Sequence, residues 1–94
     1  MNINSTTKLF LVLNKLQDGD KDIFRKNIEP LNYFDLTPNT VLICSDLDGD
    51  AIVEIATKGI KENNLGKITV ILDHSVIYGK GKIVDDSRET VFDK

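Results

Sequence analysis

Apolar residues of the chain fall into short runs separated by turn-forming residues. Runs at 9–13, 40–44 and 67–73 have the length and the β-branched content of buried strands. The first run also fits one face of a helix, because Leu9, Val12, Leu13 and Leu16 recur at helical spacing. Its apolar residues are consecutive, however, and the next segment already supplies a helix, so we favour a strand within 7–16.

Two segments have the 3.6-residue periodicity of a helix. The first begins at Asp20 or Asp22, either of which could cap it, and continues to about Asn27 before Pro30. The second extends from Ala51 to about Asn63 and is expected to end at 64–66, where Gly66 is a typical C-terminal stop. In the second helix, one face is apolar and the opposite face is charged. The apolar positions are Ile52, Ile55, Ala56, Gly59 and Ile60, and the charged positions are Asp50, Glu54, Lys58 and Lys61.

The remaining segments predict shorter elements. An aromatic stretch at 31–36 could form a short strand, and a turn at 37–39 joins it to the strand at 40–44. Residues 76–84 could form two short strands around a glycine-rich turn, or one bulged edge strand. Residues 1–6 and 85–94 are polar and are expected to be flexible ends.

This order of elements predicts one small α/β (α+β) domain over residues 1–94. The expected architecture is a ferredoxin-like split βαβ sheet with two helices on one face and an extra C-terminal strand or hairpin. The alternative is a three-layer fold with a parallel sheet, in which strands 40–44 and 67–73 are parallel neighbours joined by the second helix.

Composition and charge restrict the classes of function. The net charge of −3 and the pI near 5.0 argue against a nucleic-acid binder that neutralises phosphates. No window has the 18 or more apolar residues of a membrane span, and the N-terminus lacks the features of a secretory signal, so we expect a cytoplasmic protein. The single cysteine, Cys44, lies in an apolar run and is expected to be a buried, inert thiol.

The loop 45–50 is the best candidate for metal chemistry. Asp46, Asp48 and Asp50 alternate at the end of a strand, and Mg²⁺ prefers such oxygen ligands. The spacing excludes an EF-hand, because the sixth and twelfth positions are Ala51 and Thr57. A plainer explanation is that Asp48 or Asp50 caps the following helix.

This loop carries two family resemblances. Residues 45–52 resemble the Asp-x-Asp metal-binding motif of toprim domains, which implies Mg²⁺ on Asp46 and Asp48. Such domains also have a Glu at the end of an earlier strand, where this chain has Asn14. Asp46-Leu47-Asp48-Gly49 is also similar to the haloacid dehalogenase motif, which implies that Asp46 is a nucleophile.

Two other motifs contain residue types that could bind a ligand or act in catalysis. The stretch 79–82, Gly-Lys-Gly-Lys, could bind phosphate but lacks the Walker A spacing, so a lysine-bearing hairpin turn is expected. Asp73-His74-Ser75 has the residue types of a nucleophilic triad, but catalytic triads are assembled in space rather than in sequence. His74, the only histidine, is therefore expected to be a solvated loop residue.

No complete catalytic constellation is present, which favours a non-catalytic protein that binds another protein as a regulator, inhibitor or immunity-type factor. The candidate partner-binding residues are Tyr33 and Phe34, as an aromatic patch, and Asp46 and Asp48, which could steer a basic partner. A homodimer is possible, and no cofactor other than Mg²⁺ is implied. The alternative is a Mg²⁺-dependent phosphoryl-transfer enzyme or nuclease, or a metal- or nucleotide-binding domain, that uses Asp46, Asp48 and Asp50.

Overall fold

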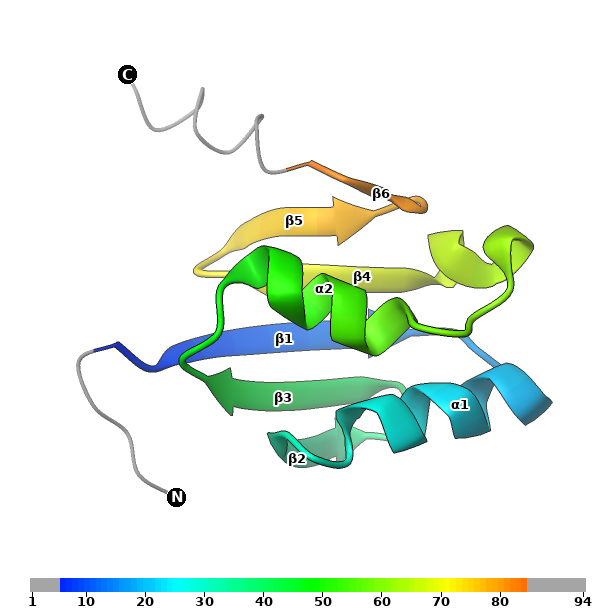
Figure 1. Cartoon of the computed structure of the whole chain (residues 1–94), viewed down its shortest axis with the longest axis horizontal. Coiled ribbons are helices and arrows are strands. Elements are labelled where there is room, and N and C mark those ends of the chain that lie inside the picture. Colours follow the sequence, from blue (N-terminus) through cyan, green and yellow to red (C-terminus); the bar gives the residue numbers. More distant parts are fainter. Residues whose placement is uncertain (1–5, 85–94) are drawn as a thin grey trace.

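A six-stranded antiparallel sheet with helices against one face forms the domain, in a computed structural model that describes residues 6–84 (Figure 1). It is a small compact α+β domain with a radius of gyration of 13.0 Å. The elements in chain order are β1 (Lys8–Asn14), α1 (Asp18–Ile28), β2 (Asn32–Thr37), β3 (Thr40–Ser45), α2 (Gly49–Thr57), the short 3₁₀ helix η1 (Glu62–Lys67), β4 (Ile68–Leu72), β5 (Ser75–Gly79) and β6 (Lys82–Ile83). The strand prediction for the ambiguous first segment is therefore confirmed.

The strands lie in the order β2-β3-β1-β4-β5-β6. β3 and β4 are both antiparallel to β1, which lies between them, so they run in the same direction without being neighbours. The alternative parallel sheet is wrong, because every strand pair within the described residues is antiparallel. β5 and β6 extend the sheet beyond β4, in agreement with the expected extra C-terminal hairpin.

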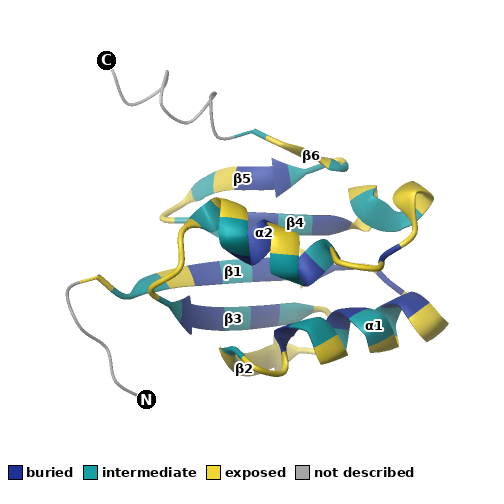
Figure 2. Ribbon diagram, viewed as in Figure 1, coloured by how far each residue is buried: buried dark blue, intermediate teal, exposed yellow. Residues whose placement is uncertain are grey.

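α1 and α2 cover the same face of the sheet and bury its side chains (Figures 1 and 2). Phe10 and Val12 on β1 are fully buried beneath them, together with Val41 and Ile43 on β3. The helices contribute Phe24 and Ile28 from α1 and Ile52, Val53 and Ala56 from α2. The apolar face predicted for α2 therefore meets the sheet at Ile52 and Ala56, whereas Ile55 is only partly buried.

α1 begins earlier than predicted and without the predicted cap. Its N-cap is Gln17, which makes no side-chain capping bond. Asp20 instead lies buried inside the first turns, where its Oδ2 accepts a hydrogen bond of 2.6 Å from Asn64 Nδ2. The carboxylate thus ties α1 to η1, a contact between residues 44 positions apart that local capping rules cannot anticipate.

α2 ends at Thr57, six residues before the expected end at Asn63. Gly59 then adopts a positive φ of 79°, a conformation that glycine tolerates best. Asn27 on α1 satisfies the end of α2, because its Nδ2 donates to the carbonyl oxygens of Ala56 at 3.2 Å and Lys58 at 2.7 Å. Gly66, expected to stop this helix, lies within η1 instead.

Two tight hairpin turns connect β4, β5 and β6. Asp73 and His74 form the first turn with φ values of 54° and 69°, and Lys80 and Gly81 form the second with 55° and 79°. Two consecutive residues with positive φ are typical of type I′ turns, which match the twist of the flanking strands. Only one of the four residues is a glycine, so the first turn in particular is strained.

The predicted flexible ends fall almost entirely outside the described residues, which include only Thr6 of the two segments. Within residues 6–84, none of the helices has both the length and the apolar character needed to cross a bilayer.

Candidate binding surface

The face of the sheet opposite the helices carries apolar side chains, and no helix within residues 6–84 covers it. Because side chains alternate along a strand, Leu9, Leu11 and Leu13 lie on the face opposite Phe10 and Val12. The strand register places further apolar residues beside them. We define the open face as Leu9, Leu11, Leu13, Phe34, Leu42, Ile71 and Val76.

These side chains are accessible to solvent. Leu9 is 52% exposed, Val76 46%, Phe34 44% and Leu13 37%, whereas Phe10 and Val12 on the same strand are 0% exposed. Leu11, Leu42 and Ile71, at the centre of the open face, are partly buried by their neighbours. Phe34 pairs with Leu42, Leu42 with Leu11, Leu11 with Ile71, and Ile71 with Val76. The apolar residues therefore form a continuous band across five strands.

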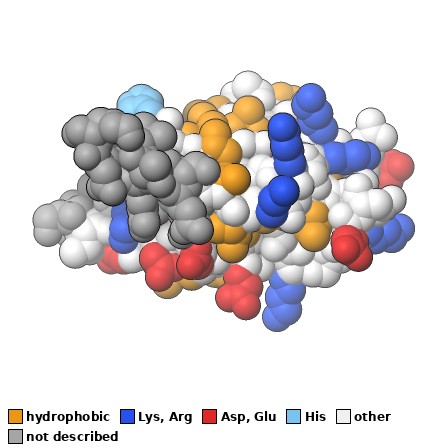
Figure 3. All heavy atoms as spheres, turned by 90° about the horizontal axis from the view of Figure 1, so that it is seen from above, with side chains coloured by type: hydrophobic (Ala, Val, Ile, Leu, Met, Phe, Trp, Pro, Cys, Tyr) orange, Lys and Arg blue, Asp and Glu red, His pale blue; other side chains and the backbone are white. Residues whose placement is uncertain are grey.

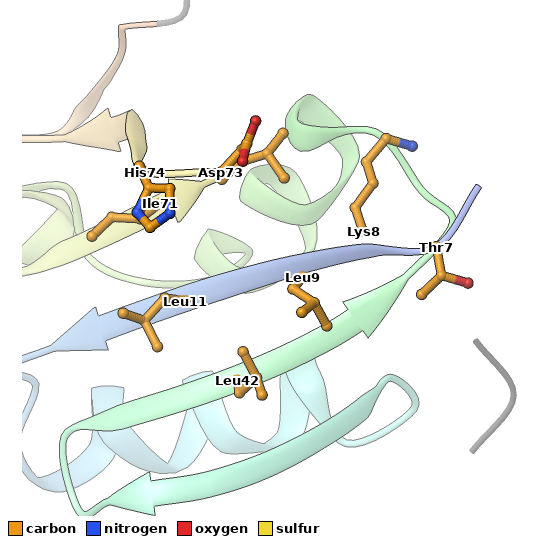
Figure 4. A pocket seen from close by; sticks show the side chains of 9 residues that line it. Thr7, Lys8, Leu9, Leu11, Leu42, Ile71, Asp73 and His74 are labelled. Atoms are coloured by element: carbon orange, nitrogen blue, oxygen red, sulfur yellow. The ribbon is translucent and has the colours of Figure 1, made fainter. Parts of the chain in front are cut away.

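A shallow hollow of ≈ 680 Å³ lies on this face (Figure 4). Its floor consists of Leu9, Leu11, Leu42 and Ile71, and the remaining lining residues are Thr7, Lys8, Leu72, Asp73 and His74. Figure 4 shows the leucines rising from β1 and β3 while His74 and Asp73 stand at one side. The hollow thus combines an apolar floor with polar groups along part of its edge.

The predicted metal residues lie in the loop between β3 and α2, and two of them have structural partners. Asp46 Oδ1 accepts a hydrogen bond from Thr7 Oγ1 at 2.9 Å. Asp48 is the N-cap of α2, and its Oδ1 accepts from the backbone N–H of Ala51 at 2.9 Å. Asp50 lies exposed in the first turn of the helix, where a negative charge suits the helix dipole.

Among residues 6–84, no three His, Cys, Asp or Glu side chains come together closely enough to hold a metal ion. Asp46, Asp48 and Asp50 would have to rearrange to bind Mg²⁺ together, and Asp48 would give up its capping bond. Magnesium binding by this loop stays a prediction. Chemical-shift changes confined to residues 45–51 on titration with millimolar Mg²⁺ would support it, and a spectrum without them would refute it.

The two aromatic candidates, Tyr33 and Phe34, lie on opposite faces of the sheet, because they are adjacent in β2. Phe34 belongs to the open face. Tyr33 pairs with Ile43 on the helix-covered side, where the Arg25 guanidinium lies 5.8 Å from the centre of its ring. The predicted aromatic patch is therefore not a single surface, and only Phe34 joins the open face.

An ion pair fixes the edge of the helix-covered face beside Tyr33. Both guanidinium nitrogens of Arg25 donate to the carboxylate of Asp35, at 2.8 and 2.7 Å. These hydrogen bonds lower the pKa of Asp35 and raise the pKa of Arg25. The pair links α1 to the edge strand β2 and faces away from the open face.

The other residues considered for catalysis or ligand binding lie where their structural roles were predicted. Cys44 is a free thiol with 5% exposure, in agreement with a buried cysteine. His74 is an exposed turn residue, as expected. The glycine–lysine stretch forms the β5–β6 hairpin turn, also as expected, and does not open a helix.

Sequence reasoning missed the open face itself, above all Leu9, Leu11, Leu42 and Ile71. A signal was present, because β1 and β3 are apolar at consecutive positions and therefore on both faces. Only two helical segments of useful length were available, and both are adjacent in space on one side of the sheet. The apolar residues on the other side therefore remain without a cover from the described part of the chain.

The chain has no detectable relatives in three kinds of comparison: no family model, no curated protein and no solved structure matches it.

Proposed function

We propose that this protein is non-catalytic and acts by binding another protein through the open face, as a regulator, inhibitor or immunity-type factor. The observation that carries the proposal is the continuous apolar band from Phe34 on β2 to Val76 on β5, four of whose residues are more than a third exposed. Contiguous exposed apolar surface of this kind marks interaction sites more often than single exposed residues do.

The composition of the band supports a protein partner. Leucine, isoleucine, valine and phenylalanine at its centre are the residue types of a desolvated interface core. Polar side chains, including Thr7, Asp73 and His74, lie at its border and resemble a polar rim. A sheet of hydrogen-bonded strands also holds its backbone in place, so little conformational entropy would be lost on binding.

We further assign the elements from β1 to β4, apart from the short η1, to a ferredoxin-like split βαβ arrangement. The element order β1-α1-β2-β3-α2-β4, the strand order β2-β3-β1-β4 and the helices on one face support this assignment. β5 and β6 are then additions at one edge. In this arrangement, the helix-free face is the large surface left for a partner.

Affinity capture from host extract with matched variants tests the proposal. Leu9→Glu and Val76→Glu each place a carboxylate on the open face at a position about half exposed, where the substitution is compatible with folding. The control is Leu47→Glu, at a residue 42% exposed in the β3–α2 loop outside the open face. We expect the wild-type protein and the control to retain the same partner and both open-face variants to lose it.

Retention of the partner by both open-face variants would overturn the proposal. Circular dichroism melting curves of all four proteins show whether the fold has survived, so that a lost partner can be attributed to the surface. Asp46→Asn/Asp48→Asn tests the electrostatic part separately, since neutral residues would slow association with a basic partner without removing the apolar contact.

A further inference from the structure

We infer that the protein seated on the open face is a second copy of this chain, packed face to face with its strands reversed. This inference rests on the proposed function, because it names the partner of the same surface. It follows from the distribution of charge at the two ends of the sheet.

One end of the sheet is acidic. Here β3 and β4 finish. Asp46 and Asp48 follow β3, Asp50 lies in the first turn of α2, and Asp73 follows β4, and all four are exposed. The start of β1 adds Lys8, whose Nζ donates to the backbone oxygen of Asp46 at 3.3 Å. Four aspartates and one lysine give this end a formal charge of −3.

The opposite end of the sheet is basic. Lys15 follows β1, Lys67 is the last residue of η1 before β4, and the β5–β6 hairpin contributes Lys80 and Lys82, all exposed. Together they give a formal charge of +4. Asp18, at the start of α1, and Glu62, at the start of η1, also lie at this end and reduce its formal charge to +2. Lysine and arginine side chains gather toward this end when the β5–β6 edge is viewed from above (Figure 3).

Charges from both ends lie beside the open face. Lys15 directly follows β1, and its backbone bond to Lys67 extends the β1–β4 pairing, so it continues the row of Leu9, Leu11 and Leu13. At the other end, Asp46 Oδ1 accepts a hydrogen bond from Thr7, which lines the hollow on this face. The backbone N–H of Lys15 donates to the oxygen of Lys67 at 3.0 Å, so these two lysines are neighbours.

This distribution is self-complementary under a two-fold axis. If the axis lies parallel to the sheet and perpendicular to its strands, the two open faces meet and the strand direction is reversed. The basic end of each copy then lies over the acidic end of the other, while the apolar bands cover one another. Sheets packed in this way lie about 10 Å apart, as in a β-sandwich.

The size of the open face sets the expected strength. Five strands about 4.8 Å apart and about 17 Å long give a projected area of roughly 400 Å². A standard interface buries about 800 Å² on each partner, so the dimer is expected to be weak, with a Kd on the order of 10–100 µM. Because the charged ends attract one another, screening by high salt should weaken the dimer further.

Sedimentation analysis over about 1 to 500 µM protein tests the inference. We expect a reversible dimer of the wild-type chain that Leu9→Glu/Val76→Glu weakens at least tenfold. Lys15→Glu/Lys67→Glu reverses the basic end, and Asp46→Lys/Asp73→Asn reverses or removes charge at the acidic end. Each alone should weaken the homodimer, because both of its charge contacts are lost. An equimolar mixture of the two should associate, because the unchanged acidic end of one variant then meets the unchanged basic end of the other.

The control is Lys26→Glu/Lys58→Glu, which makes the same change in net charge at exposed positions of the helical layer and should leave the dimer intact. A wild-type chain that is monomeric throughout would overturn the inference. So would a dimer insensitive to the open-face variants, or a pair of reversed variants that does not associate. A monomer that still captures a host protein through the open face would overturn this inference alone and leave the proposed function standing.

Discussion

The two faces of the sheet are built from the same strands and nearly the same residue types, yet they differ completely in exposure. On β1, Phe10 and Val12 are fully buried, whereas Leu9 and Leu13, their immediate neighbours, are 52% and 37% exposed. The difference arises from the two crossover helices, which both lie on one side. One face therefore stabilises the fold, whereas no helix of residues 6–84 packs on the other.

The sharpest test of this comparison is a pair of alanine substitutions on β1. Phe10→Ala should lower the free energy of unfolding by about 3–5 kcal/mol, because it removes a fully buried aromatic side chain and leaves a cavity. Leu9→Ala, one residue away, should cost about 1 kcal/mol or less, since half of its surface is already in water. Urea denaturation of both variants below about 1 µM, where a weak dimer has dissociated, measures the difference. Equal losses would contradict the distinction between the faces.

The helical layer should depend on the contact between α1 and the end of α2. Asn27→Ala removes the amide that donates to Ala56 and Lys58 and leaves their carbonyl oxygens without this partner. We expect a loss of about 1–2 kcal/mol in the free energy of unfolding. Asp48→Ala, at the other end of the same helix, serves as the comparison and should cost about 1 kcal/mol. An unchanged midpoint for Asn27→Ala would show that solvent caps the helix equally well.

A substitution in the strained turn beside the open face should raise the stability of the protein rather than lower it. His74 has a φ of 69°, which costs an L-residue roughly 1–2 kcal/mol and glycine almost nothing. His74→Gly should therefore raise the free energy of unfolding, by about 0.5–1 kcal/mol after the greater flexibility of unfolded glycine is included. Ser75→Gly, in the adjoining strand, should lower it by a similar amount. Thermal or urea denaturation of the two variants would give shifts of opposite sign.

The smallest effect concerns the ion pair at the edge of the helix-covered face. Asp35→Asn should cost about 0.2–1 kcal/mol at neutral pH, because the pair is largely exposed. Its contribution has a defined pH dependence, since the hydrogen bonds from Arg25 hold the folded-state pKa of Asp35 below the ordinary aspartate value of 3.8. The stabilisation is present above that value and is lost as the pH falls through the lower, folded-state pKa.

Denaturation of the wild-type protein and Asp35→Asn between pH 7 and pH 2 measures this dependence. The two stabilities should converge at the acid end, where Asp35 is protonated in the folded protein. A difference between wild type and Asp35→Asn that grows on acidification would contradict the pKa shift.

The strands and the helix-covered core could be predicted from the local sequence pattern. Consecutive apolar residues at 9–13 and 40–44 identified the central strands, and the spacing of Ile52 and Ala56 identified the buried side of α2. The helix ends could not be predicted from the sequence. α2 ends where Asn27 from another helix meets it, and Asp20 is buried by a partner 44 residues away, so both outcomes depend on tertiary contacts.

The candidate surface could be predicted from the sequence only in part, for a different reason. Strand alternation alone separates Tyr33 from Phe34, and the sequence prediction of one aromatic patch overlooked it. The open face, in contrast, follows only once the order of the strands and the side chosen by both helices are known. Of the predicted partner-binding residues, Phe34 lies on that face, and Asp46 and Asp48 lie at its acidic end.

The central place of β1 has a consequence for synthesis of the chain on the ribosome. The first strand to emerge must wait for residues 40–45 on one side and for residues 68–72 on the other. A nascent chain interrupted before Ile68 would display the bare edge of its most hydrophobic strand. The sheet is therefore completed only after β4 has emerged, and chaperones that shield extended apolar segments would be needed most before that point.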